Sequence, residues 1–135
     1  MYEWLKDYHK LEEEISYLEY QLERSKKELW RWVAGDLQGV PLQRESIAAN
    51  LEEIIQRIEH ELAHKMNDLY NLRKLISTFK GLDHKILRLK YIDGMTLEEI
   101  AEELTYSFSH IKKKHAELVR TIRFVERYHL GSLQK

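Results

Sequence analysis

The sequence predicts an all-α fold, and three observations support this prediction. The 135 residues include only 5 Gly and 1 Pro, which leaves few positions for the turns of a many-stranded sheet. Two long stretches repeat apolar residues in alternating steps of four and three, as the seam between paired helices requires. The carboxyl-terminal part carries shorter amphipathic segments separated by capping and turn residues. We therefore expect a helical-hairpin domain over residues 1–80 and a group of shorter helices over residues 81–135.

The first long helix is expected over residues 4–32. Its seam consists of Trp4, Tyr8, Leu11, Ile15, Leu18, Leu22, Ser25, Leu29 and Trp32. Residues 33–45 follow, and they contain Gly35, Gly39 and Pro41, which end a helix and shape a turn. Val40 and Leu42 in this stretch are expected to pack. We interpret it as a hairpin connector, and an exposed loop that contacts a protein partner is the alternative.

The second long helix is expected to begin after a cap at Ser46 and to end near Phe79. Its seam consists of Leu51, Ile55, Ile58, Leu62, Lys65, Leu69, Leu72, Ile76 and Phe79. Folding the chain at the centre of the connector brings Lys65, the charged member of this seam, close to Glu14. The two helices then form an antiparallel coiled-coil hairpin. A homodimer through the same helices is the alternative, because one polar seam residue can also set an oligomeric state.

Residues 60–64 match the zinc-peptidase pattern H-E-x-x-H, in which two histidines bind zinc and the glutamate is the general base. Leu62 lies at a seam position, so His60 and His64 are expected to point away from the core. The flanking residues are typical of a solvated helix, and no third ligand follows at a suitable spacing. We therefore predict that the protein is not an enzyme and holds no metal or cofactor.

The carboxyl-terminal part begins at Gly81, which fits the position just past the end of a helix. Asp83 is expected to cap a supporting helix over His84 to Tyr91. Thr96, with Glu99 three residues later, fits a capping box at the start of the next helix. The apolar face of that helix consists of Leu97, Ile100, Ala101 and Leu104.

Ser107 is the expected cap of the last helix, after a three-residue break at residues 105–107. This helix is expected to run to about Tyr128, with a frayed tail from Gly131. Its core face consists of Ile111, His115, Leu118, Ile122 and Val125. A short helix, a tight turn and a helix with a basic outer face are typical of a helix-turn-helix, whose second helix enters the DNA major groove.

The charge distribution agrees with that interpretation. The net charge is -1, but residues 80–135 carry 11 basic and 8 acidic side chains. From Lys112 to the end of the chain there are 7 basic and 2 acidic side chains. The positive charge thus lies on and after the last helix, where a phosphate-binding surface would need it.

The stretch LRLKYIDGMTLEEIAEELTYSFSHIKKKH combines an LRLKY helix end, a TLEEIAEEL helix and an S-x-x-x-I-K-x-K start. It resembles region four of bacterial sigma factors, over about residues 82–123. Taken whole, the chain is similar to phage and prophage transcriptional regulators of the RinA and ArpU type. The resemblance implies a sigma-like helix-turn-helix behind a helical amino-terminal half, with host RNA polymerase as a possible partner.

The sequence departs from the sigma pattern in two places. Sigma factors usually carry Arg and Glu where this chain has Phe108, Ser109 and His110. They often have Gly in the turn where this chain has Thr105. A standard promoter is therefore a poor expected target, and a slightly different turn is expected.

The expected function is sequence-specific binding of double-stranded DNA by a transcriptional regulator that activates phage or prophage genes. The DNA-binding residues that the pattern and the resemblance indicate are Ser107, Ser109, His110, Lys112, Lys113, Lys114, Arg120 and Arg123. Base reading is assigned to Ser109, His110 and Lys113, and phosphate contacts to the other basic residues. The alternative is a phage DNA-packaging or assembly protein that resembles a small terminase, which would also combine helical oligomerisation with a helix-turn-helix.

Composition narrows the cellular context. The chain has no Cys, which excludes disulfides and thiolate metal sites. No apolar run approaches the ~18 residues of a membrane span, and the first residues lack the layout of a signal peptide. We expect a cytoplasmic protein without a membrane partner.

Overall fold

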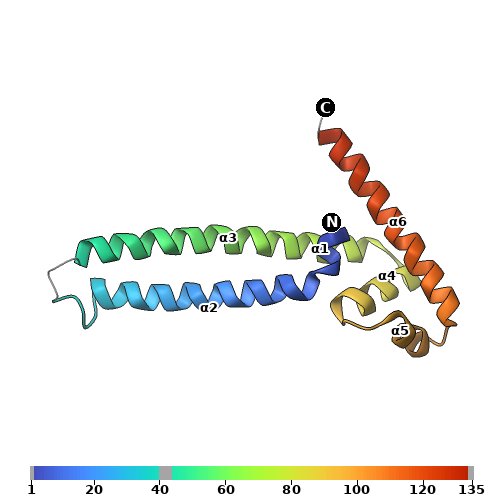
Figure 1. The fold of residues 1–135 in the computed structure, drawn as a ribbon, viewed down its shortest axis with the longest axis horizontal. Helices are drawn as coiled ribbons and strands as arrows, with labels where there is room; N and C mark the ends of the chain where they lie inside the picture. The colour runs from blue at the N-terminus through green and yellow to red at the C-terminus, as the bar shows by residue number, and fades with distance from the viewer. Residues whose placement is uncertain (1, 40–43, 134–135) are drawn as a thin grey trace. The chain divides into compact units, whose positions relative to one another are not determined.

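The computed structural model describes residues 2–39 and 44–133, and its regular elements are all helical. They are α1 (Tyr2–Lys6), α2 (Tyr8–Val33), α3 (Arg44–Thr78), α4 (Gly81–Leu87), the π-helix η1 (Arg88–Ile92), α5 (Leu97–Leu104) and α6 (Phe108–Leu133) (Figure 1). No strand occurs in these residues, and the prediction of an all-α fold is confirmed. The expected packing of Val40 and Leu42 lies outside the described residues. None of the helices described combines the length and apolar character needed to cross a bilayer.

The chain forms two compact units. Met1–Leu11 and Leu69–Lys135 make up one of them, here called the terminal unit. Glu12–Asp68 make up the other, here called the helix-pair unit. The division suggested by the sequence, into a helical-hairpin domain over residues 1–80 and a DNA-binding domain over residues 81–135, stays a prediction.

In the helix-pair unit, α2 and α3 lie side by side with opposite chain directions (Figure 1). Two ion pairs link the helices. Lys65 Nζ lies 2.6 Å from Glu14 Oε2, and Lys26 Nζ lies 3.7 Å from Glu59 Oε1. The predicted approach of Lys65 to Glu14 is confirmed.

The beginning of the chain differs from the prediction of one continuous helix from residue 4. Asp7 interrupts it, and its backbone N–H lies within hydrogen-bond distance of both Glu3 O and Trp4 O, at 3.2 and 3.1 Å. The seam therefore does not continue through Asp7 with the same phase. Trp4 is 48% exposed, whereas Leu5 is fully buried. The assignment of Trp4 to the seam is wrong, and Leu5 takes that role.

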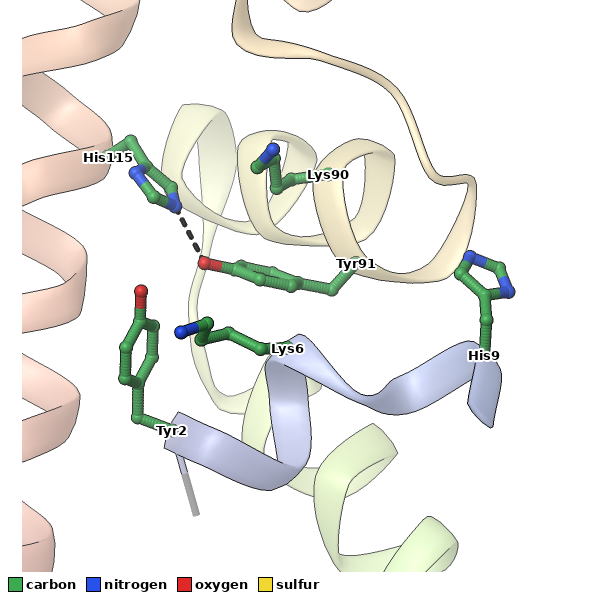
Figure 2. A pocket seen from close by; sticks show the side chains of 6 residues that line it. All are labelled: Tyr2, Lys6, His9, Lys90, Tyr91 and His115. Carbon is green, nitrogen blue, oxygen red and sulfur yellow. Dashed lines mark hydrogen bonds between the residues drawn. The ribbon is translucent and has the colours of Figure 1, made fainter. Parts of the chain in front are cut away.

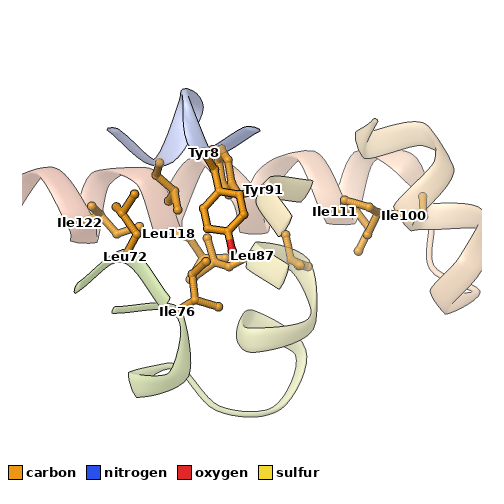
Figure 3. Packing of buried hydrophobic residues seen from close by; sticks show 12 residues of the cluster. Tyr8, Leu72, Ile76, Leu87, Tyr91, Ile100, Ile111, Leu118 and Ile122 are labelled. Atoms are coloured by element: carbon orange, nitrogen blue, oxygen red, sulfur yellow. The ribbon is translucent and has the colours of Figure 1, made fainter. Parts of the chain in front are cut away.

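The core lies in the terminal unit, where every helix of the unit contributes to one cluster (Figure 3). The buried members are Leu5, Tyr8, Leu72, Ile76, Ile86, Leu87, Tyr91, Ile100, Ala101, Ile111, Leu118 and Ile122. The amino-terminal segment belongs to this core, and Arg73 Nε donates a hydrogen bond to the Tyr8 hydroxyl at 2.7 Å. Val125, which was predicted on the core face of the last helix, is 54% exposed instead.

Several helix ends also differ from the prediction. α4 already begins at Gly81, which takes a positive φ of 60°, and no side-chain hydrogen bond caps this helix. Asp83 is therefore not the cap; it lies in the first turn, with its carboxylate 3.9 Å from Lys114 Nζ. α4 passes directly into η1, which ends with a bond from Asp93 N–H to Arg88 O. α6 continues to Leu133, so Gly131 lies within the helix.

Candidate nucleic-acid interface

Side-chain caps fix the starts of α5 and α6. Thr96 Oγ1 accepts a hydrogen bond from the Glu99 backbone N–H at 3.2 Å, and Ser107 Oγ accepts one from the His110 N–H at 3.2 Å. Both predicted caps are confirmed. The Glu99 carboxylate accepts a bond from the Thr96 hydroxyl at 3.1 Å, instead of the predicted bond to the cap amide. Each cap satisfies a backbone N–H that has no partner within its own helix.

The turn between these helices depends on a left-handed residue. Thr105 has φ 59° and ψ 41°, and the Tyr106 N–H bonds back to Ala101 O at 2.9 Å. A side chain with a Cβ in this conformation costs roughly 1–2 kcal/mol, and glycine avoids that cost. The turn thus adopts a conformation that favours glycine, although threonine occupies it.

Packing in the core of the terminal unit sets the orientation of α6 (Figure 3). Ile111, Leu118 and Ile122 are buried, and α5 and α6 are in contact. At about 100° per residue, Ser109, Lys113 and Arg120 fall on the opposite side of the helix. The three side chains are exposed. The core therefore orients a polar and basic face of α6 toward solvent.

Six of the predicted DNA-binding residues are exposed on α6: Ser109, His110, Lys112, Lys113, Arg120 and Arg123. Two aromatic side chains that the sequence reasoning did not include lie against them. The His110 ring stacks on Tyr106, with centroids 5.2 Å apart, and Lys112 Nζ lies 6.0 Å from the centroid of the Phe108 ring. The second contact joins two residues that are four apart on α6, a spacing that could have indicated it.

Three of the predicted residues have hydrogen-bond or ion-pair partners. The Ser107 hydroxyl caps α6. Lys114 Nζ lies 3.9 Å from Asp83 Oδ1. The Arg123 guanidinium lies 4.5 Å from the centroid of the Tyr2 ring and 4.0 Å from Glu3 Oε1. Because exposed ion pairs contribute little free energy, Lys114 and Arg123 could exchange these partners for a phosphate.

Four glutamates, Glu98, Glu99, Glu102 and Glu103, are exposed on α5. Their charge is opposite to that of the α6 face and would repel a polyanion. The electrostatics of the α5–α6 segment therefore favour an anionic partner on α6 and disfavour one on the outer side of α5.

A second polar site of the terminal unit is a pocket of about 350 Å³ lined by Tyr2, Lys6, His9, Lys90, Tyr91 and His115 (Figure 2). The Tyr91 hydroxyl and His115 Nε2 form a hydrogen bond of 2.7 Å. Burial raises the pKa of Tyr91. Burial, with the nearby Lys90 charge, lowers the pKa of His115, so this imidazole is neutral near pH 7. The sequence reasoning placed His115 on the inner face of its helix but did not identify the pocket.

The two histidines and the glutamate of the H-E-x-x-H pattern are exposed on α3, and the Glu61 carboxylate lies 3.6 Å from Lys65 Nζ. In the described parts of the chain, no group of three or more His, Cys, Asp or Glu side chains is placed to hold a metal ion. No protein-family model, curated protein or solved structure matches the chain in comparisons with known proteins.

Proposed function

We propose that the protein is a sequence-specific DNA-binding transcriptional regulator in which α5 and α6 act as a helix-turn-helix. The observation that carries this proposal is the exposed face of α6, which presents basic and small polar side chains. Two capped helices and a three-residue turn hold this face, and α6 packs on α5 through buried apolar residues. A rigid helix with such a face has the dimensions and charge that the major groove accepts.

The position of each residue along α6 suggests its role. Ser109, His110 and Lys113 lie in the first two turns, the part of a recognition helix that contacts base edges. Lys113 can donate to guanine acceptors, and Ser109 can donate or accept. Lys112 and Arg120 are assigned to backbone phosphates, because they extend the basic surface along the helix.

The sigma-like pattern supplies the biological part of the proposal, namely activation of phage or prophage genes beside the host RNA polymerase. A homodimer through α2 and α3 would let two copies read two half-sites. Exposed aromatic side chains on the helix-pair unit, Tyr17, Tyr20 and Trp30, are compatible with such an assembly.

The test is binding of the full-length protein to fragments of its own genome at two salt concentrations. The variant Lys112→Ala/Lys113→Ala is compared with Lys26→Ala/Lys27→Ala, which removes an equally adjacent lysine pair from the helix-pair unit. We expect one fragment to stay bound at high salt, and the α6 variant to bind it at least about 10-fold more weakly. The control variant should bind like the wild type.

The other outcomes reject this function in different ways. Uniform, salt-sensitive binding of all fragments would indicate non-specific contact with phosphates, and a large ring-shaped oligomer in light scattering would then favour DNA packaging. Absence of binding at both salt concentrations would show that the basic face of α6 is only a solvated surface.

A further inference from the structure

The pocket around the Tyr91–His115 hydrogen bond has a lining without a carboxylate. Its six side chains comprise two lysines, two histidines and two tyrosines. Carboxylates are otherwise frequent in this chain, which has 23 Asp and Glu among its 135 residues. The lining therefore offers cations and hydrogen-bond donors to a ligand.

The two ammonium groups are available to a ligand. Lys90 is partly buried, and in the described part of the chain it makes no ion pair. Lys6 Nζ lies 3.8 Å from Glu3 Oε2, an exposed pair that competes weakly, and 5.6 Å from the centroid of the Tyr2 ring. Figure 2 shows the Lys6 ammonium and the Tyr2 hydroxyl pointing toward the Tyr91–His115 pair.

The far wall of the pocket is fixed by backbone geometry. Gly94 has a positive φ of 74°, and a Cβ at this position would lie 3.2 Å from His9 Nε2. The His9 side chain thus lies against the turn after η1. A residue with a Cβ at position 94 would crowd the His9 ring. Tyr91, on another wall, is buried in the core cluster. The lining is therefore held by packing on two sides.

We propose that this pocket binds a small organic anion that carries a phosphate group. The Lys6 ammonium and the Tyr2 hydroxyl can donate to a phosphate group, and the Lys90 ammonium adds positive charge on the other side of Tyr91. The tyrosine and histidine rings provide flat walls for the organic part of the ligand. A volume of about 350 Å³ is at the small end of the range for ligand pockets, roughly 300–1,000 Å³.

An anionic ligand would change the electrostatic surroundings of His115. Burial and, after it, the Lys90 charge lower the pKa of this imidazole. A bound phosphate would offset the Lys90 charge and so oppose the second of these two causes.

The position of the pocket favours a small molecule over the phosphates of a DNA backbone. On α6, His115 lies about 120° around the helix from Ser109, at about 100° per residue. A duplex lying on the exposed polar face would not cover this flank. The inference does not depend on DNA binding, because α1, the start of α2, η1 and α6 form the pocket within the terminal unit.

The experiment is a titration of the full-length ¹⁵N-labelled protein with inorganic phosphate, then with phenyl phosphate, at constant ionic strength. We expect saturable shifts of the amides of Lys6, Lys90 and His115, with tighter binding of phenyl phosphate because its ring can contact the walls. Lys6→Gln and Lys90→Gln should each weaken binding at least about 10-fold, a loss of roughly 1.4 kcal/mol. Lys85→Gln, at an exposed lysine of α4, is the matched control and should leave binding unchanged. Circular dichroism and the Tm confirm that each variant folds.

Three results would overturn the proposal. The first is the absence of saturable shifts at the pocket with either compound. The second is an equal loss of binding in the folded Lys85→Gln variant. The third is a short DNA duplex that shifts the same pocket amides and displaces phenyl phosphate, which would assign the site to the DNA backbone.

Discussion

The terminal unit and the helix-pair unit hold their helices together by different means. The terminal unit encloses twelve buried side chains in one cluster. In the described part of the helix-pair unit, Ile15 and Ile55 are the buried apolar side chains, and ion pairs between the helices add to them. Two helices can cover only one strip of each other, whereas several short helices can surround a side chain completely. Length of helix is therefore a poor guide to local stability in this protein.

Truncating one buried isoleucine in each unit should give the largest difference between them. Ile111→Ala removes a fully buried side chain from the terminal unit and should lower the free energy of unfolding by about 3–4 kcal/mol. Ile55→Ala removes a side chain that is 8% exposed and borders solvent, so a loss of about 2 kcal/mol is expected. Urea denaturation followed by circular dichroism measures both values. Equal losses would contradict the claim that the two units differ in the quality of their packing.

A smaller effect is expected from the ion pair in the helix-pair unit. Glu14→Gln keeps the shape of the side chain but removes the charge that faces Lys65. The Glu14 side chain is 37% exposed and solvent screens the pair, so we expect a loss of about 1 kcal/mol or less. The Glu14 hydrogen bond raises the pKa of Lys65. The part of the stability that depends on Lys65 is therefore fully present below the unfolded lysine pKa of about 10.4 and is lost as the pH rises through the folded pKa.

Denaturation of the wild type and Glu14→Gln at pH 7 and pH 9 tests this prediction, because both pH values lie below the unfolded lysine pKa of about 10.4. The difference between the two proteins should be the same at the two pH values. Glu13→Gln, next to Glu14 and exposed, is the control for the loss of one negative charge. If the difference in unfolding free energy between the two proteins already disappears at pH 9, the pKa of Lys65 is not raised.

The sequence predicts best what depends on local periodicity and capping. The seam of four-and-three steps predicts the inward side of both long helices, and folding at the connector predicts the Lys65–Glu14 pair. The Thr96 and Ser107 caps follow from residue type and spacing, because the bond that each hydroxyl accepts spans only three residues. Such features need no knowledge of the remaining chain.

The sequence predicts poorly what depends on the packing of distant segments. The burial of Leu5 in place of Trp4 follows from the break at Asp7 and from the docking of the amino-terminal segment in the core. The pocket likewise needs Tyr2 and Lys6 to meet Lys90 and His115, which lie more than eighty residues away along the chain. Neither of these long-range contacts produces a periodic pattern in the sequence. The contact of Lys112 with Phe108 is of the local kind, because the two residues are four apart on α6.

The smallest expected effect comes from removing the backbone strain at Thr105, in the turn of the terminal unit. Thr105→Gly should relieve the cost of the left-handed conformation, about 1–2 kcal/mol, but glycine also gains about 0.5–1 kcal/mol of freedom in the unfolded chain. We therefore expect a net gain in unfolding free energy of about 0.5 kcal/mol. Thr105→Ala keeps a Cβ and should show no such gain, which separates backbone strain from loss of the hydroxyl. A destabilising glycine variant would mean that the threonine side chain itself supports the turn. A glycine variant that is as stable as the wild type or more stable would mean that the packing of Ile100 and Ile111, rather than the residue at position 105, determines how α5 contacts α6.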